Sequence, residues 1–300
     1  MITDFAKTRV AFIGLGVMGN SMAGHLLAAG CLLSIFTRTA SKAKNLIERG
    51  AIWKDTPEAA VENADFVFSI VGDPSDVEAI YLNDPGIIST LPSGSVAVDM
   101  TTSSPTLARR IADAGSKKNI QVLDAPVSGG DLGARSGKLS IMVGGDRLAY
   151  EKTLPFLEKM GANIVYQGVA GAGQSTKMCN QIAIGGSMLG MVEALTFAKS
   201  AKLDPETVLK SISTGAAGSW SLDNLAPRIL RNDFEAGFFV HHFIKDMRIA
   251  LSSAQDMGLD LPGLELSLRQ YEALASSGYA FKGTQALANL YFAESEKVAK

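Results

Sequence analysis

Cysteine is scarce in this chain of 300 residues, which contains only Cys31 and Cys179. Two cysteines so far apart make neither a CxxC pair nor a disulfide framework, which fits a reducing compartment, and we therefore expect a cytoplasmic protein. Histidine is almost as rare. His25, His241 and His242 have no cysteine or acidic partner at the spacing of zinc ligands, so the sequence predicts no metal site.

An excess of charge of one sign is also lacking. The 28 lysines and arginines nearly balance the 30 acidic residues, and the formal net charge is -2. Such a balance provides no basic surface for nucleic acid or for an anionic membrane. Residues 1–9 mix charges and lack the apolar core of a signal peptide. We therefore expect neither nucleic acid nor a membrane as a partner.

One apolar run, residues 178–198, is long enough that a membrane span has to be considered. Asn180, Gln181 and Glu193, two amides and a carboxylate, lie inside it. These side chains favour a buried helix of a soluble protein instead. With 47% apolar and 19% charged residues the chain can build a sizeable core, and its length suits two domains.

A glycine-rich segment follows the first predicted strand, residues 9–13, and precedes a helical pattern over 20–29 and a second apolar strand over 31–36. Strand, GxGxxG, helix and strand in this order are typical of dinucleotide binding. The glycines allow a tight turn, close approach of a pyrophosphate and packing of the helix on the strand, while N–H groups at the helix start bind the anion. The cofactor-binding residues predicted here are Gly14, Leu15, Gly16, Val17, Met18 and Gly19.

The end of the second strand indicates which dinucleotide is bound. An NAD enzyme usually has an acidic residue about 20 positions after the glycines, where it accepts hydrogen bonds from the ribose. This chain has Arg38 and Thr39 there, followed by Ser41 and Lys42. A guanidinium suits a 2′-phosphate, whereas the alternative is a solvated arginine without a role. We therefore predict Arg38 and Thr39 as cofactor-binding residues, and NADP rather than NAD as the cofactor.

The order of predicted elements divides the chain in two. Strand-like runs alternate with helical patterns at 65–71, 95–99, 121–123, 139–143 and 163–166, which predicts a mostly parallel sheet covered on both faces. Only helical patterns follow, at 175–201, 205–213, 222–230, 241–257, 264–276 and 284–298. We expect an α/β fold: a doubly wound, Rossmann-type domain over 1–166, and an all-helical domain for substrate binding and oligomerisation over 167–300, joined by a long helix.

The start of the joining helix contains the clearest candidate for catalysis. Glycines in the segment 168–173 indicate a turn that leads into a helix. Lys177, Asn180 and Gln181 follow at spacings i, i+3 and i+4, so they share one helix face. An amine and amides on an otherwise apolar helix, at a junction of domains where ligands tend to bind, predict a polar site. The alternative is a lysine that extends to solvent.

Loops after the predicted strands are where such sheets bind ligands. Small or hydroxyl residues occupy three of them, at 71–74, 99–103 and 124–130. Ser128 with two following glycines can offer a hydroxyl and N–H donors to a carboxylate. The alternative for each loop is an ordinary turn. Further along, Lys245 lies among aromatic residues, where the alternative is a core helix with a surface ion pair.

Taken together, these motifs resemble the β-hydroxyacid dehydrogenase family, which includes 3-hydroxyisobutyrate dehydrogenases, tartronate semialdehyde reductases and succinic semialdehyde/glyoxylate reductases. Four segments in the family's order show the resemblance: the cofactor loop 14–19, Asp-Ala-Pro-Val-Ser-Gly-Gly over 124–130, the lysine signature over 168–180, and Lys245-Asp246. The match covers nearly the whole chain. It also implies a homodimer or homotetramer.

The resemblance assigns roles to particular positions. It makes Lys177 the catalytic lysine and Asn180 its neighbour at the substrate. The positions that match its substrate-binding residues are Ser128, Gly129, Gly130, Lys177, Asn180 and Phe238. The positions that match its cofactor-binding residues are Val71 and Gly72 on the adenosine side and Thr102 and Lys245 at the nicotinamide end.

The implied activity is an NADP(H)-dependent interconversion of a short β-hydroxy or γ-hydroxy acid and its semialdehyde. The cofactor carries the hydride, and Lys177 donates or accepts the proton. Two alternatives stay open: a non-catalytic dinucleotide-binding sensor or scaffold, and a 6-phosphogluconate-type dehydrogenase. The Lys177/Asn180 pair argues against the first, and the lack of a clear phosphate-binding cluster argues against the second. A lysine at this position also argues against the related imine reductases.

Overall fold

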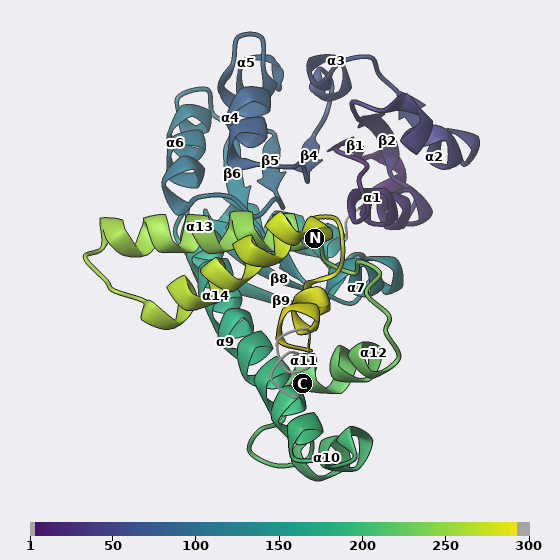
Figure 1. The fold of residues 1–300 in the computed structure, drawn as a ribbon. Coiled ribbons are helices and arrows are strands. Elements are labelled where there is room, and N and C mark those ends of the chain that lie inside the picture. The colour runs from purple at the N-terminus through teal and green to yellow at the C-terminus, as the bar shows by residue number, and fades with distance from the viewer. Residues whose placement is uncertain (1–3, 293–300) are drawn as a thin grey trace. The chain divides into compact units, whose positions relative to one another are not determined.

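Nine strands form one sheet in the amino-terminal part of the computed structural model, which describes residues 4–292 (Figure 1). Their order is β3-β2-β1-β4-β5-β6-β8-β7, with β9 paired to β8. The first six strands of this order are parallel, whereas β8 runs antiparallel to β6 and β7. The strands are β1 (Arg9–Ile13), β2 (Leu32–Phe36), β3 (Ile52–Trp53), β4 (Phe66–Ser69), β5 (Val96–Asp99), β6 (Gln121–Asp124), β7 (Val127–Ser128), β8 (Leu139–Gly145) and β9 (Gly161–Gly168). The mostly parallel sheet predicted from the sequence is confirmed.

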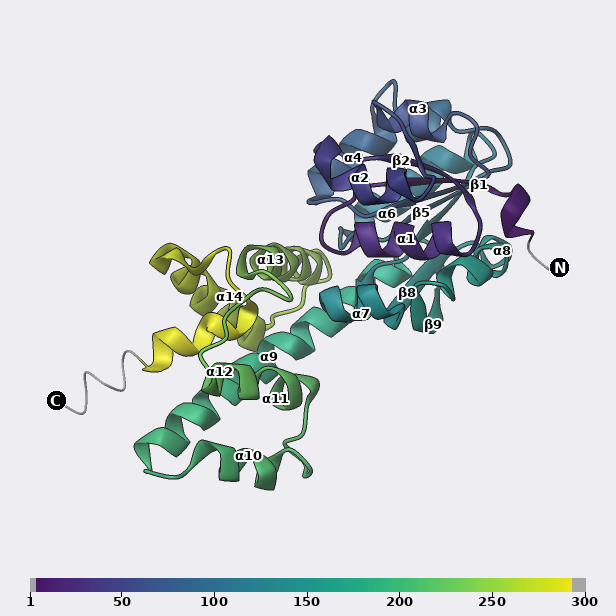
Figure 2. The ribbon, with the colours of Figure 1, turned by 90° about the vertical axis from the view of Figure 1, so that its right-hand side faces the viewer.

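Alternating side chains give the sheet an apolar core on each face. In β1, Val10 and Phe12 belong to one core, whereas Ala11 and Ile13 belong to the other. Helices cover both faces, as Figure 2 shows for α1 on one side and α3 and α4 on the other. The helices of this part are α1 (Gly19–Ala28), α2 (Lys44–Glu48), α3 (Pro57–Val61), α4 (Pro74–Leu82), α5 (Ile87–Thr90), α6 (Pro105–Ser116), α7 (Gly130–Ser136) and α8 (Arg147–Leu157), with 3-10 helices at Phe5–Lys7 and Ala40–Ala43.

Several of these helices start directly after strand-end loops, because the sequence supplies caps there. In α6 the Ser104 hydroxyl accepts the Leu107 N–H at 3.0 Å and Pro105 occupies the first turn, where no N–H partner is needed. In α4, the Asp76 carboxylate accepts the N–H of the N-cap residue Asp73 at 3.3 Å, and Pro74 occupies the first turn. These caps fix where the loops at the carboxyl ends of β4 and β5 end.

The carboxyl-terminal part is helical, as predicted. Its helices are α9 (Ala172–Ser200), α10 (Pro205–Ile212), α11 (Trp220–Asn224), α12 (Ala226–Leu230), α13 (Val240–Asp256) and α14 (Pro262–Leu274), followed by a π-helical turn (Ala275–Tyr279) and a 3-10 helix (Thr284–Leu287). The single helix expected over 222–230 is wrong: Pro227 lies in the first turn of a second helix, α12. Of the helix expected over 284–298, residues 293–298 lie outside the described part.

The chain divides into two compact units inside α9, the first ending at Lys177 and the second beginning at Met178. The boundary expected from the sequence lies earlier, between residues 166 and 167, which is within β9. The first unit extends to Lys177 because the start of α9 is hydrogen-bonded to the end of β6, through the N–H groups of Gly171 and Gln174.

Helix α9 is long and apolar enough to cross a membrane by length and composition alone, a test that the core helix of a soluble protein also passes. Its side chains Met188, Val192 and Leu195 belong to the apolar core of the second unit. There they pack with residues of α13 and α14, such as Phe243 and Tyr271. One face of the apolar run predicted as a buried helix therefore contributes to the core of the second unit, whereas other side chains of the run, such as Phe197, are exposed.

Candidate active site

The predicted cofactor loop is a tight turn between β1 and α1, and each of its glycines has a physical reason. Gly14 has a φ of +96°, and a Cβ there would collide with the Ile70 carbonyl. A Cβ at Gly19 would collide with the Gly14 carbonyl, so the helix start packs directly on the turn. At Gly16 a Cβ would meet no atom within 4 Å, so backbone is open to a ligand there. This geometry fits a dinucleotide pyrophosphate.

Arg38 lies in the loop after β2, and its side chain is 78% exposed. Its guanidinium donates to both carboxylate oxygens of Asp76 on α4, at 3.1 Å and 3.4 Å. Asp76 also accepts the Asp73 N–H at 3.3 Å and lies against Gly72, where a Cβ would be 2.6 Å from the carboxylate. The Asp76 carboxylate thus lies next to two predicted cofactor residues, Arg38 and Gly72. The sequence did not predict a role for Asp76, because it is 38 positions from Arg38 along the chain.

A buried polar chain lies beneath the loop that contains Thr102. The Ser69 hydroxyl donates to Asp99 Oδ1 at 3.0 Å and therefore accepts from the Tyr81 hydroxyl, 2.9 Å away. Asp99 also accepts the Thr101 N–H at 3.2 Å, and the Thr101 hydroxyl accepts the Val71 N–H at 2.9 Å. The Thr101 hydroxyl therefore joins the two loops that follow β4 and β5, and the strand-end side chains of Ser69 and Asp99 bond to each other beneath them.

Two buried carboxyl groups, Asp99 and Asp124, end neighbouring strands in register. Burial is the main cause that raises the pKa of each to about 6, and for Asp99 the nearby Asp124 charge adds to the rise. Hydrogen bonds oppose this effect, most strongly from Thr101 to Asp99 and from the Gly171 N–H to Asp124. At neutral pH both carboxyls are therefore mostly ionised, at a cost in stability.

We expect this cost to appear as a pH dependence of folding. Between about pH 4 and pH 6 the folded protein keeps protons on Asp99 and Asp124 that the unfolded chain has released, so their contribution to stability falls as pH rises through this window. The fall is on the order of 1–3 kcal/mol for each carboxyl. Urea unfolding of wild type and Asp99→Asn at pH 4.5 and pH 7.5 measures it: the advantage of wild type over the variant should shrink at the higher pH. If the stability difference between wild type and Asp99→Asn is the same at both pH values, the pKa of Asp99 is not raised. The exposed carboxyl of Asp113, tested as Asp113→Asn, is the control.

The predicted catalytic residues lie where α9 begins. Lys177 is buried, with 6% of its surface exposed, although lysine is among the residues least often buried. Asn180 is three residues further along, on the same helix face, and half-buried. A buried amine next to an amide on one helix face provides a proton donor and a hydrogen-bonding group in an environment poor in water.

Asn180 is oriented by a chain of side chains in the second unit. Its amide N–H donates to Gln181 Oε1 at 2.7 Å, and Gln181 Nε2 donates to Asp246 at 2.6 Å. Asp246 on α13 also pairs with Lys245 at 3.2 Å. Gln181, expected to contribute to the polar face with Lys177 and Asn180, is 1% exposed and uses its side chain to join α9 to α13.

Ser128, Gly129 and Gly130 lie where strand β7 meets helix α7. Ser128 is the last residue of β7 and pairs with Ser140 of β8. Gly129 and Gly130 have φ values of +126° and +60°, in the region that favours glycine. The sequence predicted a plain loop here, because a two-residue strand is too short to show a pattern. The result is a half-buried serine followed by two backbone N–H groups at the start of α7.

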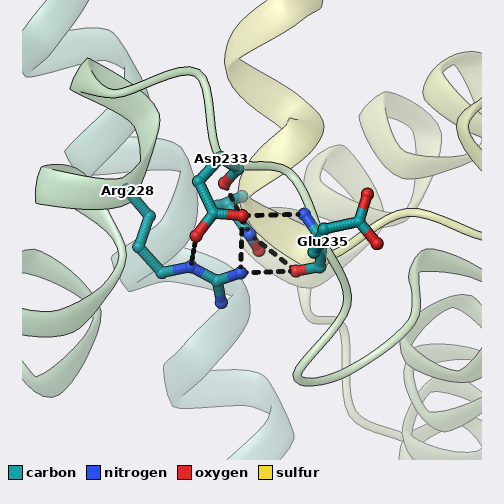
Figure 3. A network of polar contacts seen from close by, with 4 residues as sticks. Arg228, Asp233 and Glu235 are labelled. Atoms are coloured by element: carbon teal, nitrogen blue, oxygen red, sulfur yellow. Dashed lines mark hydrogen bonds and ion pairs between the residues drawn. The ribbon is translucent and has the colours of Figure 1, made fainter.

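Phe238 precedes α13 in a loop that a polar network fixes (Figure 3). Arg228 donates to both Asp233 oxygens, at 2.8 Å and 3.0 Å, and to the Glu235 carbonyl at 2.7 Å. The Asp233 carboxylate also accepts the Glu235 N–H at 3.1 Å, and the Arg228 guanidinium is the main cause that lowers the pKa of Asp233 to about 2. The network thereby orders the segment that ends in Phe238, whose ring packs 5.8 Å from that of Phe243.

Among the described residues, no group of three or more histidine, cysteine and acidic side chains is placed to hold a metal ion. The structure thus shows a dinucleotide turn, a buried lysine and hydroxyl-bearing loops at strand ends. Such a combination is suited to hydride transfer by a bound cofactor with proton transfer by the protein.

Comparison with known proteins identifies the family. Residues 9–168 match the family model described as the NAD binding domain of 6-phosphogluconate dehydrogenase, and residues 171–291 match that described as NAD-binding of NADP-dependent 3-hydroxyisobutyrate dehydrogenase. An uncharacterized oxidoreductase of Bacillus subtilis (strain 168) is 53% identical, with 95% of this chain and 99% of the relative covered. A probable mitochondrial 3-hydroxyisobutyrate dehydrogenase-like protein of Arabidopsis thaliana is 50% identical over 94% of this chain and 84% of its own.

A solved structure of a 3-hydroxyisobutyrate dehydrogenase has the same fold. The Mycobacterium tuberculosis 3-hydroxyisobutyrate dehydrogenase with L-serine superimposes with a TM-score of 0.87 at 27% identity, covering 94% of this chain and 98% of the other. The fold and the family models define an oxidoreductase that uses a nicotinamide dinucleotide. The chain belongs to the β-hydroxyacid dehydrogenase family, as the resemblance implied.

Proposed function

We propose that this protein is an NADP(H)-dependent oxidoreductase that interconverts a short β- or γ-hydroxy acid and its semialdehyde, with Lys177 as the group that moves the proton. The observation that supports this most directly is the buried Lys177 one helical turn from Asn180, at the start of α9. Burial of an amine is unfavourable, so a buried lysine at this position is a candidate for a functional role.

The residues have separate roles in this proposal. The bound nicotinamide supplies or accepts the hydride. Lys177 gives a proton to the substrate oxygen during reduction and takes it back during oxidation, and Asn180 hydrogen-bonds the reacting group. Ser128 and the N–H groups after it bind the substrate carboxylate. The turn 14–19, the loops containing Val71 and Thr102, and Lys245 are proposed to hold the cofactor. A homo-oligomer, implied by the family resemblance, stays a prediction.

Oxidation of NADPH by the purified chain in the presence of short aldehyde acids tests the proposal. Loss of NADPH absorbance that depends on the aldehyde is expected. NADPH binding without turnover for any short aldehyde acid would instead support a non-catalytic dinucleotide-binding module.

The preference for NADP(H) is expected to depend on Arg38. A charge-assisted contact with the 2′-phosphate contributes about 1.5–3 kcal/mol, so kcat/KM with NADPH should exceed that with NADH by roughly ten- to hundredfold. Arg38→Asp should shift the preference toward NADH. Asp76→Asn should raise the NADPH preference, because it removes a carboxylate that both pairs with Arg38 and repels a phosphate.

The control for this comparison is Arg110→Ala. Arg110 is another exposed arginine. It lies on α6 and pairs at 2.7 Å with Glu78 of α4 rather than with Asp76, the partner of Arg38. It should leave the ratio of NADPH to NADH unchanged. Equal kcat/KM values for the two cofactors in wild type, or an unchanged ratio of these values in Arg38→Asp, would show that Arg38 does not bind the 2′-phosphate.

A further inference from the structure

The start of α9 is attached to the sheet by one buried carboxylate. Asp124, at the end of β6, accepts the Gly171 N–H at 2.7 Å and the Gln174 N–H at 2.8 Å with its two oxygens. A Cβ at Gly173 would collide with the Met142 and Asp124 carbonyls, so the helix lies directly on the strands. Asp124 thus satisfies two of the N–H groups that a helix start leaves without partners, from an element about 50 residues away.

The same helix turn holds the loop after β5 through the side chain of Gln174, which is fully buried. Its Oε1 accepts the Ser103 N–H at 2.9 Å, and its Nε2 donates to the Thr101 carbonyl at 2.7 Å. The two bonds bracket Thr102, the residue proposed to contact the nicotinamide end of the cofactor. The oxygen and the nitrogen of the Gln174 amide therefore both hold the short loop after β5.

Gln174 also has a fixed relation to the catalytic lysine. Gln174 and Lys177 are i and i+3 on α9, about 4.5 Å apart along the axis and on the same side. Asp124 in turn begins the segment that leads to Ser128, through Ala125, Pro126 and β7. Two buried side chains, Asp124 and Gln174, therefore link the loop containing Thr102 and the segment leading to Ser128 to the helix turn that precedes Lys177.

We propose that Gln174 and Asp124 are positioning residues, which set the location of Lys177 relative to the loops containing Thr102 and Ser128. This inference rests on the proposed function, since it gives Lys177 the proton transfer. Displacement of a reacting group by about 1 Å costs on the order of 100-fold in rate. Loss of these contacts therefore lowers the rate of the chemical step more than it lowers the affinity for NADPH.

The test variant is Gln174→Met, which keeps the length of the side chain and removes both hydrogen bonds. We expect kcat per NADPH-binding site to fall at least roughly tenfold, with a smaller change in the dissociation constant of NADPH. NADPH fluorescence counts the binding sites and so separates a slower chemical step from a structural defect. A structural defect would reduce the number of sites and leave kcat per site unchanged. With NADPH deuterated at the transferred position, the isotope effect on kcat should be at least as large as in wild type.

Ser95→Ala is the matched control. Ser95 is also buried and donates to the Ala64 carbonyl at 2.9 Å, but it lies just before β5, at the end of that strand away from the loops. The Ser95→Ala variant loses a buried hydrogen bond but leaves the loops after the strands unchanged, so its kcat per NADPH-binding site should stay at the wild-type value. Asp124→Asn is the second variant, for use if Gln174→Met does not fold, since an amide keeps one of the two acceptor oxygens.

A measurement without turnover keeps this inference separate from the proposed function. In Gln174→Met, amide hydrogen exchange at Ser103 should be faster than in wild type, because its acceptor is gone. Wild type that consumes no NADPH with any aldehyde acid would overturn the proposed function. Unchanged kcat per site in active variants, or unchanged exchange at Ser103 in Gln174→Met, would overturn the positioning role.

Discussion

Replacing Lys177 with alanine is expected to lower kcat at least about 100-fold and to leave the affinity for NADPH nearly unchanged. A positioned acid or base typically contributes 10²–10⁴-fold, and Lys177 is proposed to contact the substrate rather than the cofactor. Steady-state kinetics gives the first quantity and NADPH fluorescence the second. Retained turnover would transfer the proton step to another residue.

Two comparisons define what the alanine removes. Lys177→Met fills the same space without an amine, so it should be as slow as alanine if proton transfer is lost, and faster if the defect is only a cavity. Lys199→Ala is the control on the same helix. Lys199 lies near the other end of α9, over the Phe292 ring at 3.5 Å, and its loss should not change kcat.

The features that the sequence predicted correctly are those determined by residues close together in the chain. Gly14, Gly16 and Gly19 follow a strand and start a helix within a few positions, so their spacing predicted the turn. The burial of Lys177 could be expected because it begins an apolar helix that has to pack. Alternation of strands and helices was likewise enough to predict the doubly wound sheet.

The polar networks could not be predicted, because their partners are far apart in the sequence. Gln174 bonds Ser103 and Thr101, more than 70 positions away. The link from Gln181 to Asp246 spans 65 positions. A glutamine inside an apolar helix shows that a partner must exist, since buried polar groups are hydrogen-bonded, but it does not show which one.

The best substrate is expected to be a short aldehyde acid in which a spacer separates the carboxylate from the reacting carbon. Ser128 and the N–H groups after it are neutral donors on β7 and α7, whereas Lys177 is on α9, so in the proposed function different elements bind the anion and the reacting group. A 2-oxo acid has both groups on adjacent carbons and reaches both sites poorly. Tartronate, methylmalonate or succinate semialdehyde has the spacer, and glyoxylate serves as a small, poorly fitting analogue.

We expect the charges near the same loop to disfavour a phosphorylated acid. The nearest arginine along the chain, Arg135 on α7, pairs with Asp131 at 2.7 Å, so its charge is already compensated. Asp131 itself directly follows Gly130 and repels a second negative charge. One carboxylate fits neutral donors, whereas a phosphate normally takes arginine or lysine.

Rates for a panel of these compounds, with wild type and Ser128→Ala, test this assignment. We expect the semialdehydes to exceed pyruvate and 6-phosphogluconate in kcat/KM, although a difference of one methylene among them changes the ratio by only about 10–200-fold. A hydrogen bond to a charged group contributes about 1.5–3 kcal/mol, so Ser128→Ala should raise the KM of the best substrate roughly tenfold or more and leave the KM of NADPH unchanged. A panel led by pyruvate or 6-phosphogluconate would place the carboxylate site elsewhere. If Ser128→Ala instead lowered kcat at constant KM, the hydroxyl would act on the reacting carbon rather than hold the far end of the substrate.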